Sequence, residues 1–169
     1  TSFRVVSAEA DLLSGLIIDK YEDVVVLQIS SLGMEQHKAI IVEAIQKVFR
    51  PRSVYERNEI ASRQFEGLPP LSGLLAGEPV ETVDVTINGL KFTVDLRAGH
   101  KTGMYLDQQV NHARVGAMAK GAMVLDCFTF LGGFGLHTAR AGATQVHMLD
   151  QSADAIAAAT RNAAANNLS

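Results

Sequence analysis

The first half of the chain alternates between short apolar runs and polar turns. Residues 16–19 and 24–30 are runs of strand length, and the polar residues 20–23 between them predict a hairpin. Over 33–49 apolar side chains recur at spacings of three and four, and Pro51 blocks further helix. This segment therefore predicts an amphipathic helix that covers one face of a sheet.

A second hairpin is the clearest local signal. Apolar and polar residues alternate over 83–96 on either side of Asn88-Gly89, and an Asn-Gly pair readily takes the positive φ angles of a type I′ turn. Before it, 53–55 predict a short strand, and 56–73 predict a polar loop region with room for one short helix. The pattern up to residue 97 is typical of an α+β domain.

The chain changes in character near residue 98. After a polar stretch, the pattern predicts alternating helices and strands: a helix of about ten residues ending near residue 120, a strand at 123–128, a helix at 135–140 closed by Gly142, a strand at 145–150 and a helix from 153 to about 165 capped by Ser152. Strand, helix, strand and helix in this order predict a parallel βαβ unit. The fold class is thus α/β, with domains at 1–97 and 98–169.

Composition narrows the function. A chain of 169 residues with 47% hydrophobic and 20% charged residues is typical of a globular protein, and no apolar run reaches the roughly 20 residues that span a membrane. The single cysteine, Cys127, excludes an internal disulfide and fits a reducing cytoplasm. A net charge of -3 argues against strong nucleic-acid binding by this segment alone.

Acidic residues and glycines mark the ends of the two predicted parallel strands. Asp126 ends the first strand, Gly132 and Gly133 follow, and Asp150 ends the second. Ligands bind beyond the carboxyl ends of such strands, where glycine allows close backbone approach and a carboxylate can accept ribose hydroxyls. A dinucleotide fingerprint fails, because its third glycine position is Thr138. The amine and sulfonium of S-adenosylmethionine suit an acidic first strand better than a diphosphate does.

The motifs that carry a resemblance extend over nearly the whole chain: Lys101-Thr102-Gly103-x-Tyr105-Leu106-Asp107-Gln108, Val124-Leu125-Asp126-x-Phe128-x-x-x-Gly132-Gly133-Phe134, Gly15-Leu16-Ile17-Ile18-Asp19-x-Tyr21 and Tyr55-Glu56-Arg57. In these motifs the sequence resembles the bacterial 23S, large-subunit ribosomal RNA cytosine-C5 methyltransferases that carry an N-terminal PUA domain. The resemblance implies a central α+β domain followed by the first half of a Rossmann-like class I methyltransferase domain. It also implies that S-adenosyl-L-methionine is the cofactor.

The resemblance assigns cofactor-binding roles residue by residue. The segment that folds over the cofactor comprises Lys101, Thr102, Tyr105, Asp107 and Gln108. The methionine-binding loop comprises Asp126, Phe128, Gly132 and Gly133, and the ribose-binding acid is Asp150. Leu131 departs from the family pattern, in which a small polar residue is more usual.

The resemblance also implies parts that this chain lacks, namely the PUA domain and the half of the catalytic domain with the nucleophilic cysteine. Cytosine C5 reacts only after a thiolate adds at C6. Cys127 is interpreted as a packing residue, so no catalytic residue is assigned and the chain alone is predicted to be inactive. The unpaired edge of the first strand predicts a homodimer or a poorly ordered half-domain.

Several alternatives stay open. Asp126 could cap a loop, Lys101 and Tyr105 could be surface residues of a linker, and Phe128 could belong to the core. Four arginines, at 50, 52, 57 and 63, could form a phosphate-binding patch or a solvated face, and Arg57 could instead hold the domains together. The five histidines show no metal-ligand spacing and are interpreted as structural. The alternative functions are a non-catalytic substrate-positioning or assembly module and, more distantly, a nicotinamide-dependent oxidoreductase.

Overall fold

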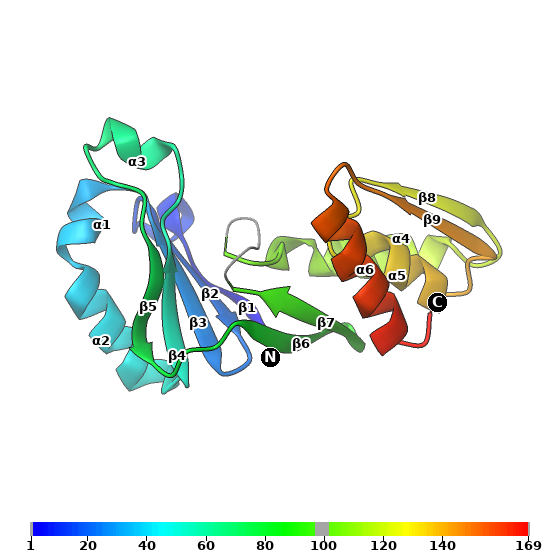
Figure 1. Cartoon of the computed structure of the whole chain (residues 1–169), viewed down its shortest axis with the longest axis horizontal. Coiled ribbons are helices and arrows are strands. Elements are labelled where there is room, and N and C mark those ends of the chain that lie inside the picture. Colours follow the sequence, from blue (N-terminus) through cyan, green and yellow to red (C-terminus); the bar gives the residue numbers. More distant parts are fainter. Residues whose placement is uncertain (1, 97–101, 169) are drawn as a thin grey trace. The chain divides into compact units, whose positions relative to one another are not determined.

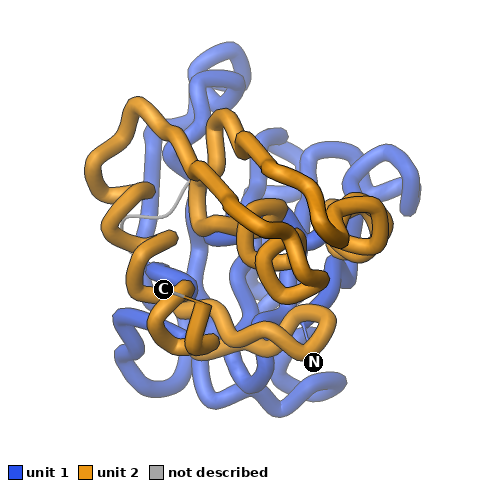
Figure 2. The backbone as a smooth tube through the Cα atoms, turned by 90° about the vertical axis from the view of Figure 1, so that its right-hand side faces the viewer, with its two compact units in different colours: residues 1–83, 94–106 blue, residues 84–93, 107–169 orange. Residues whose placement is uncertain are grey.

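A computed structural model describes residues 2–96 and 102–168, which divide into two compact units (Figure 1). Unit 1 comprises residues 1–83 and 94–106, and unit 2 comprises residues 84–93 and 107–169 (Figure 2). The division does not coincide with the predicted boundary at residues 97 and 98, because the tip of the second hairpin belongs to unit 2 and the segment before residue 107 belongs to unit 1.

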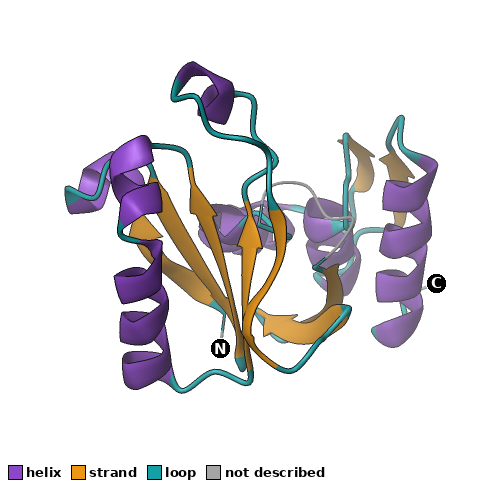
Figure 3. Ribbon diagram, turned by 60° about the vertical axis from the view of Figure 1, so that its left-hand side comes forward, coloured by secondary structure: helices purple, strands orange, loops and turns teal. Residues whose placement is uncertain are grey.

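Unit 1 is built on a five-stranded sheet with the order β1-β2-β3-β4-β5. Its strands are β1 (Phe3–Ser7), β2 (Leu16–Tyr21), β3 (Val24–Ile29), β4 (Ser53–Arg57) and β5 (Ser72–Gly77). All neighbours are antiparallel except β3 and β4, which run parallel. A parallel pair needs a crossover, and helices α1 (Leu32–Gln36) and α2 (Lys38–Phe49) supply it while covering one face of the sheet (Figure 3).

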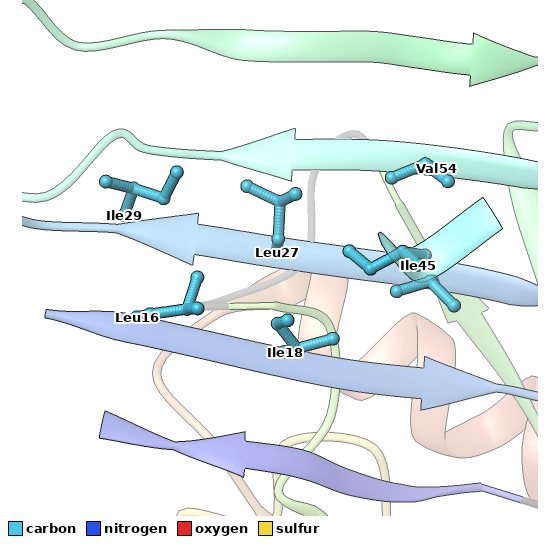
Figure 4. Close-up of a cluster of buried hydrophobic side chains, with 7 residues drawn as sticks. Leu16, Ile18, Leu27, Ile29, Ile45 and Val54 are labelled. Carbon is cyan, nitrogen blue, oxygen red and sulfur yellow. The ribbon is translucent and has the colours of Figure 1, made fainter. Parts of the chain in front are cut away.

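The core of unit 1 lies between that face and α2 (Figure 4). It consists of seven buried aliphatic side chains from three strands and the helix: Leu16, Ile18, Val25, Leu27, Ile29, Ile45 and Val54. Because alternate residues of a strand point to the same face, the odd-numbered residues of β3 enter this core. The predicted amphipathic helix is thus confirmed as the cover of a sheet.

The predicted helix at 33–49 is interrupted at His37, which has φ -98° and ψ 7°. The Nδ1 atom of His37 lies 2.7 Å from the carbonyl oxygen of Gly33, the acceptor that the amide of residue 37 would use in a continuous helix. That amide instead donates to the carbonyl of Met34. One side-chain hydrogen bond therefore divides the segment into α1 and α2.

Polar side chains are buried on the other face of the sheet. The carboxylate of Asp19 accepts two hydrogen bonds of 2.9 Å from Arg4 and one of 2.5 Å from the hydroxyl of Thr102. The Tyr21 hydroxyl donates to the backbone carbonyl of Met104 and accepts from its amide. These bonds fix the segment 102–106 on the sheet.

Unit 2 contains a parallel βαβ unit preceded by a helix. Its elements are α4 (Gln109–Met118), β8 (Met123–Cys127), α5 (Gly133–Arg140), β9 (Gln145–Leu149) and α6 (Ala153–Ala165). Strand β8 pairs in parallel with β9, from Met123 opposite Gln145 to Cys127 opposite Leu149. The hydroxyl of Ser152 accepts from the amide of Ala155 and caps α6, as predicted.

The second hairpin has the predicted form. Strands β6 (Thr82–Ile87) and β7 (Leu90–Asp95) flank a turn in which Asn88 and Gly89 both have positive φ. The side-chain amide of Asn166, in the turn after α6, bonds both the amide and the carbonyl of Lys91 on β7. This contact occupies backbone groups that an edge strand would otherwise expose.

Two strands were not predicted. Strand β1 is short, and β5 contains two glycines and lies partly in the predicted polar loop, in which α3 (Ser62–Phe65) is the short helix. Both strands are edges of the sheet. Their extended form depends on hydrogen bonds to β2 and β4, which no local pattern reveals.

Candidate functional site

The loop between β8 and α5 is organised by Asp126, the last but one residue of β8. Its Oδ2 atom accepts a hydrogen bond of 2.6 Å from the hydroxyl of Thr129 and one of 2.9 Å from the amide of Gly135. The carboxylate thus connects the end of the strand to the first turn of the helix. An ionised carboxylate has about four acceptor positions, so two bonds leave capacity for a ligand.

The backbone of this loop is unusual. Phe128, Phe130 and Gly132 have φ angles of 63°, 52° and 84°. Left-handed backbone at a residue with a side chain costs on the order of 1 kcal/mol, and such residues cluster at binding sites. Phe128 is also 84% exposed. The loop therefore presents a large aromatic ring from a strained backbone.

Asp150 holds the same loop from the neighbouring strand. It follows β9 directly, and its Oδ2 atom accepts a hydrogen bond of 3.0 Å from the amide of Phe130. Its Oδ1 atom accepts one from the amide of Ser152 at the start of α6. Two carboxylates from adjacent parallel strands thus meet one loop, and Asp150 is only half-buried.

The glycines of the loop serve packing as well as conformation. Gly132 has positive φ, whereas a Cβ atom on Gly133 would lie 2.7 Å from Nε2 of His112. A Cβ atom on Gly135 would lie 2.6 Å from the sulfur of Met148 on β9. The space beside Gly133 and Gly135 is therefore filled by the protein's own side chains. Gly135 was not among the predicted site residues, since its close contact is with a distant strand.

The other predicted site residues precede the βαβ unit in the chain. Asp107, in the 3₁₀ turn η2 (Leu106–Gln108), accepts a hydrogen bond of 3.0 Å from the side chain of Gln108, just before α4. Thr102 is 1% exposed, donates to Asp19 and belongs to unit 1, as does the exposed Tyr105. Lys101 lies outside the described residues. The structure thus brings five predicted residues to one loop: Asp126, Phe128, Gly132, Gly133 and Asp150.

Leu131, which departs from the family pattern, is joined to α6 through Asn162. The side chain of Leu131 is buried, and its carbonyl accepts a hydrogen bond of 2.9 Å from the amide of Asn162 on α6. The Oδ1 atom of Asn162 also accepts from the amide of Thr93 on β7. Asn162 therefore joins the loop to the hairpin, a role that its position in an alanine-rich helix does not reveal.

Two predicted interpretations are wrong for the described residues. Arg57 and Arg63 are buried, so the four arginines form neither a phosphate patch nor a solvated face. Arg57 donates to the carbonyl of Leu96, and Arg63 donates to the carbonyl of Ile29. Cys127 is exposed rather than packed, because its side chain lies on the uncovered face of β8.

Comparison with known proteins identifies the family. A family model described as S-adenosylmethionine-dependent methyltransferase matches residues 67–168, more than half of the chain. The chain belongs to this family. This membership agrees with the predicted cofactor and opposes the nicotinamide-dependent alternative.

Individual relatives cover the whole chain. It is 43% identical over 99% of its length to the ribosomal RNA large subunit methyltransferase I of Tolumonas auensis. A candidate SAM-dependent methyltransferase from Streptococcus mutans superposes with a TM-score of 0.86 at 27% identity, over 100% of this chain and 43% of that one. SMU.776, crystallised as a complex with SAH, does so with the same TM-score and coverage at 26% identity.

The chain is shorter than the relatives that it matches. It spans 43% of the length of its Tolumonas relative. The Rossmann-like methyltransferase fold class is confirmed by the solved structures. In the described part of the chain, no helix is long and apolar enough to cross a membrane, and no three metal-binding side chains form a cluster.

Proposed function

We propose that the chain is part of a methyltransferase that transfers a methyl group from S-adenosylmethionine to cytosine C5 of 23S ribosomal RNA, in the cytoplasm. The observation that carries the proposal is the attachment of Asp126 and Asp150 to one strained loop at the carboxyl ends of β8 and β9. Ligands of open parallel sheets bind at this edge. The 43% identity to a large-subunit ribosomal RNA methyltransferase supports the substrate.

The residues of the loop fit the chemistry of this cofactor. Asp126 offers negative charge where the amine and sulfonium of the cofactor would lie. Asp150, half-buried at the end of β9, places a carboxylate where the two ribose hydroxyls would donate. When bound, S-adenosylmethionine supplies the electrophilic methyl group, while Asp126, Asp150 and the loop backbone hold and orient it. Lys101, Thr102, Tyr105, Asp107 and Gln108 remain proposed contacts from the preceding segment.

Affinity for S-adenosylhomocysteine tests the cofactor site. Titration calorimetry of the chain and of Asp150→Ala should show at least about a 10-fold loss of affinity, because two ribose hydrogen bonds of about 1 kcal/mol each disappear. Asp154→Ala is the matched control, since Asp154 is exposed on the first turn of α6. Equal affinity of Asp150→Ala and the unmodified chain would remove Asp150 from the site.

The nucleophile is proposed to lie outside this chain. Attack at C6 needs a thiolate, and Cys127 is the sole cysteine, at the end of the strand that carries Asp126. We expect no incorporation of labelled methyl groups into large-subunit ribosomal RNA by the chain alone. Incorporation that Cys127→Ala abolishes would contradict this expectation and assign the role to Cys127.

The open side of β8 supports a proposal of self-association. Among the described residues only β9 pairs with β8, and Met123, Leu125 and Leu149 are exposed large hydrophobic side chains of this two-stranded sheet. Exposed strand edges pair readily with other chains. Sedimentation should show a homodimer that Leu125→Lys dissociates, and a monomer at all concentrations with protected β8 amides would contradict it.

A further inference from the structure

Two histidines lie directly beside the loop between β8 and α5 (residues 128–132), here called the cofactor loop. His112 of α4 and His137 of α5 are both buried, and their rings stack with centroids 5.0 Å apart and an interplanar angle of 29°. The ring of His112 also meets the edge of Phe134, the residue after Gly133, with centroids 4.5 Å apart. The pair therefore contacts the first turn of α5 from the side of α4.

Both rings contact Gly133. The Nε2 atom of His112 lies 2.7 Å from the place of a Cβ atom at residue 133, so the imidazole fills the position of the missing side chain. The Nδ1 atom of His137 lies 2.6 Å from the carbonyl oxygen of Gly133. Gly133 is thus held at its Cα atom by one histidine and at its carbonyl by the other.

The surroundings of the pair favour neutral rings. Burial first, and His137 second, lower the pKa of His112 to about 4, while Asp107 opposes the shift. Burial and Arg140 lower the pKa of His137, against the hydrogen bonds that its ring makes with the carbonyls of Gly133 and Ile87. Asn88 lies in the hairpin turn, and its side-chain amide nitrogen is 3.4 Å from Nε2 of His137.

One atom of the pair has no packing explanation. The Nδ1 atom of His112 is buried and has no hydrogen-bond partner among the described residues. An unpaired buried polar atom costs about 1–3 kcal/mol, whereas a phenyl ring in the same place would avoid that cost. Unlike a phenyl ring, a histidine in this place can take a proton.

We propose that His112 and His137 are positioning residues for the cofactor loop: as neutral rings they hold Gly133 and the first turn of α5, and protonation of His112 releases that turn. The inference rests on the proposed function of the loop. The connection to the cofactor runs through Gly135, whose amide bonds Asp126 only when the first turn of α5 is in place. The pair thereby sets cofactor affinity without contacting the cofactor, and makes it sensitive to acid.

The test measures binding of S-adenosylhomocysteine and amide hydrogen exchange at Gly135 between pH 7.5 and pH 5. The variants are His112→Phe, which keeps a ring but cannot take a proton, and His112→Ala, which removes the ring. His147→Ala is the control, because His147 is exposed on β9 of the same unit.

The unmodified chain should lose about 10-fold in affinity on acidification, with faster exchange at Gly135, because the released loop must be reordered by the ligand. His112→Phe should bind within about 3-fold of the unmodified chain at pH 7.5 and lose most of the acid dependence. His112→Ala should bind at least about 10-fold more weakly at pH 7.5, and His147→Ala should match the unmodified chain.

Three results would overturn the inference. Unchanged affinity of both His112 variants at both pH values would leave the pair without a role in binding, and so would faster exchange at Gly135 with unchanged affinity. An acid dependence that persists in His112→Phe would assign the effect to other groups. If the unmodified chain fails to bind S-adenosylhomocysteine at pH 7.5, the proposed function itself is wrong, which distinguishes the two failures.

Discussion

Strands β3 and β8 have similar apolar sequences but different surroundings. All six residues of β3 are buried, because it lies between β2 and β4, with α2 on one face and polar residues of unit 1 on the other. In β8 only Asp126 is buried, and Leu125 is 61% exposed, since β9 is its one described neighbour. An apolar run thus specifies a strand, whereas the burial of that strand depends on the neighbouring elements that the rest of the chain supplies.

The largest difference is expected from matched leucine substitutions. Leu27→Ala in β3 should lower the free energy of unfolding by about 2–5 kcal/mol, because it empties a fully buried position of the core. At concentrations low enough to keep the chain monomeric, Leu125→Ala in β8 should change it by less than about 0.5 kcal/mol, since its side chain is mostly in water in the single chain. Urea denaturation at such concentrations measures both, and equal losses would show that β8 is covered within the monomer.

The two units should also lose stability at opposite ends of the pH scale. In unit 1, burial and the charge of Asp19 raise the pKa of Tyr21 to about 12. The unfolded chain ionises near pH 10 first, so stability should fall as pH rises from about 10 to 12, by up to about 3 kcal/mol. Tyr21→Phe should remove this alkaline loss.

In unit 2 stability should change with pH in the opposite direction. The pKa of His112 is about 4, so the unfolded chain takes up a proton near pH 6.5, before the folded chain does. Stability should fall as pH decreases from about 6.5 to 4, by up to about 3 kcal/mol, and the contribution of His112 should be constant above that range. Thermal unfolding of the chain and of His112→Phe checks it, and an identical acid profile of the two proteins would exclude His112 as the cause.

The smallest expected effect concerns the helix caps. Ser152 caps α6 in unit 2, and Ser31 caps α1 in unit 1 while donating a further hydrogen bond of 3.1 Å to the carbonyl of Ser14. Each serine-to-alanine change should cost about 1 kcal/mol, with the larger loss at Ser31. Chemical denaturation of both variants tests the order. Ser72→Ala on β5, which removes an exposed hydrogen bond to Glu59 but no helix cap, is the control.

Part of the candidate site could be predicted because it depends on strand ends. Asp126 and Asp150 terminate two parallel strands, and parallel strands bring their carboxyl ends to one edge. The contacts of His112, Gly135 and Asn162 could not be predicted in this way. Each joins residues from different elements, and one sequence carries no periodicity that records such a contact.

Local sequence patterns specify most of the elements and their order, but not β1, β5 or the interruption between α1 and α2. Periodicity predicted the helical segment that contains α2, the Asn-Gly pair predicted the β6–β7 turn, and Ser152 predicted the start of α6, because each depends on neighbours within a few residues. Only the tertiary structure decided which apolar faces are covered, which arginines are buried, and which side chain fills the space at Gly133. Those outcomes depend on hydrogen bonds and packing between segments far apart in the chain. Such contacts contribute to stability only when the folded chain brings the segments together.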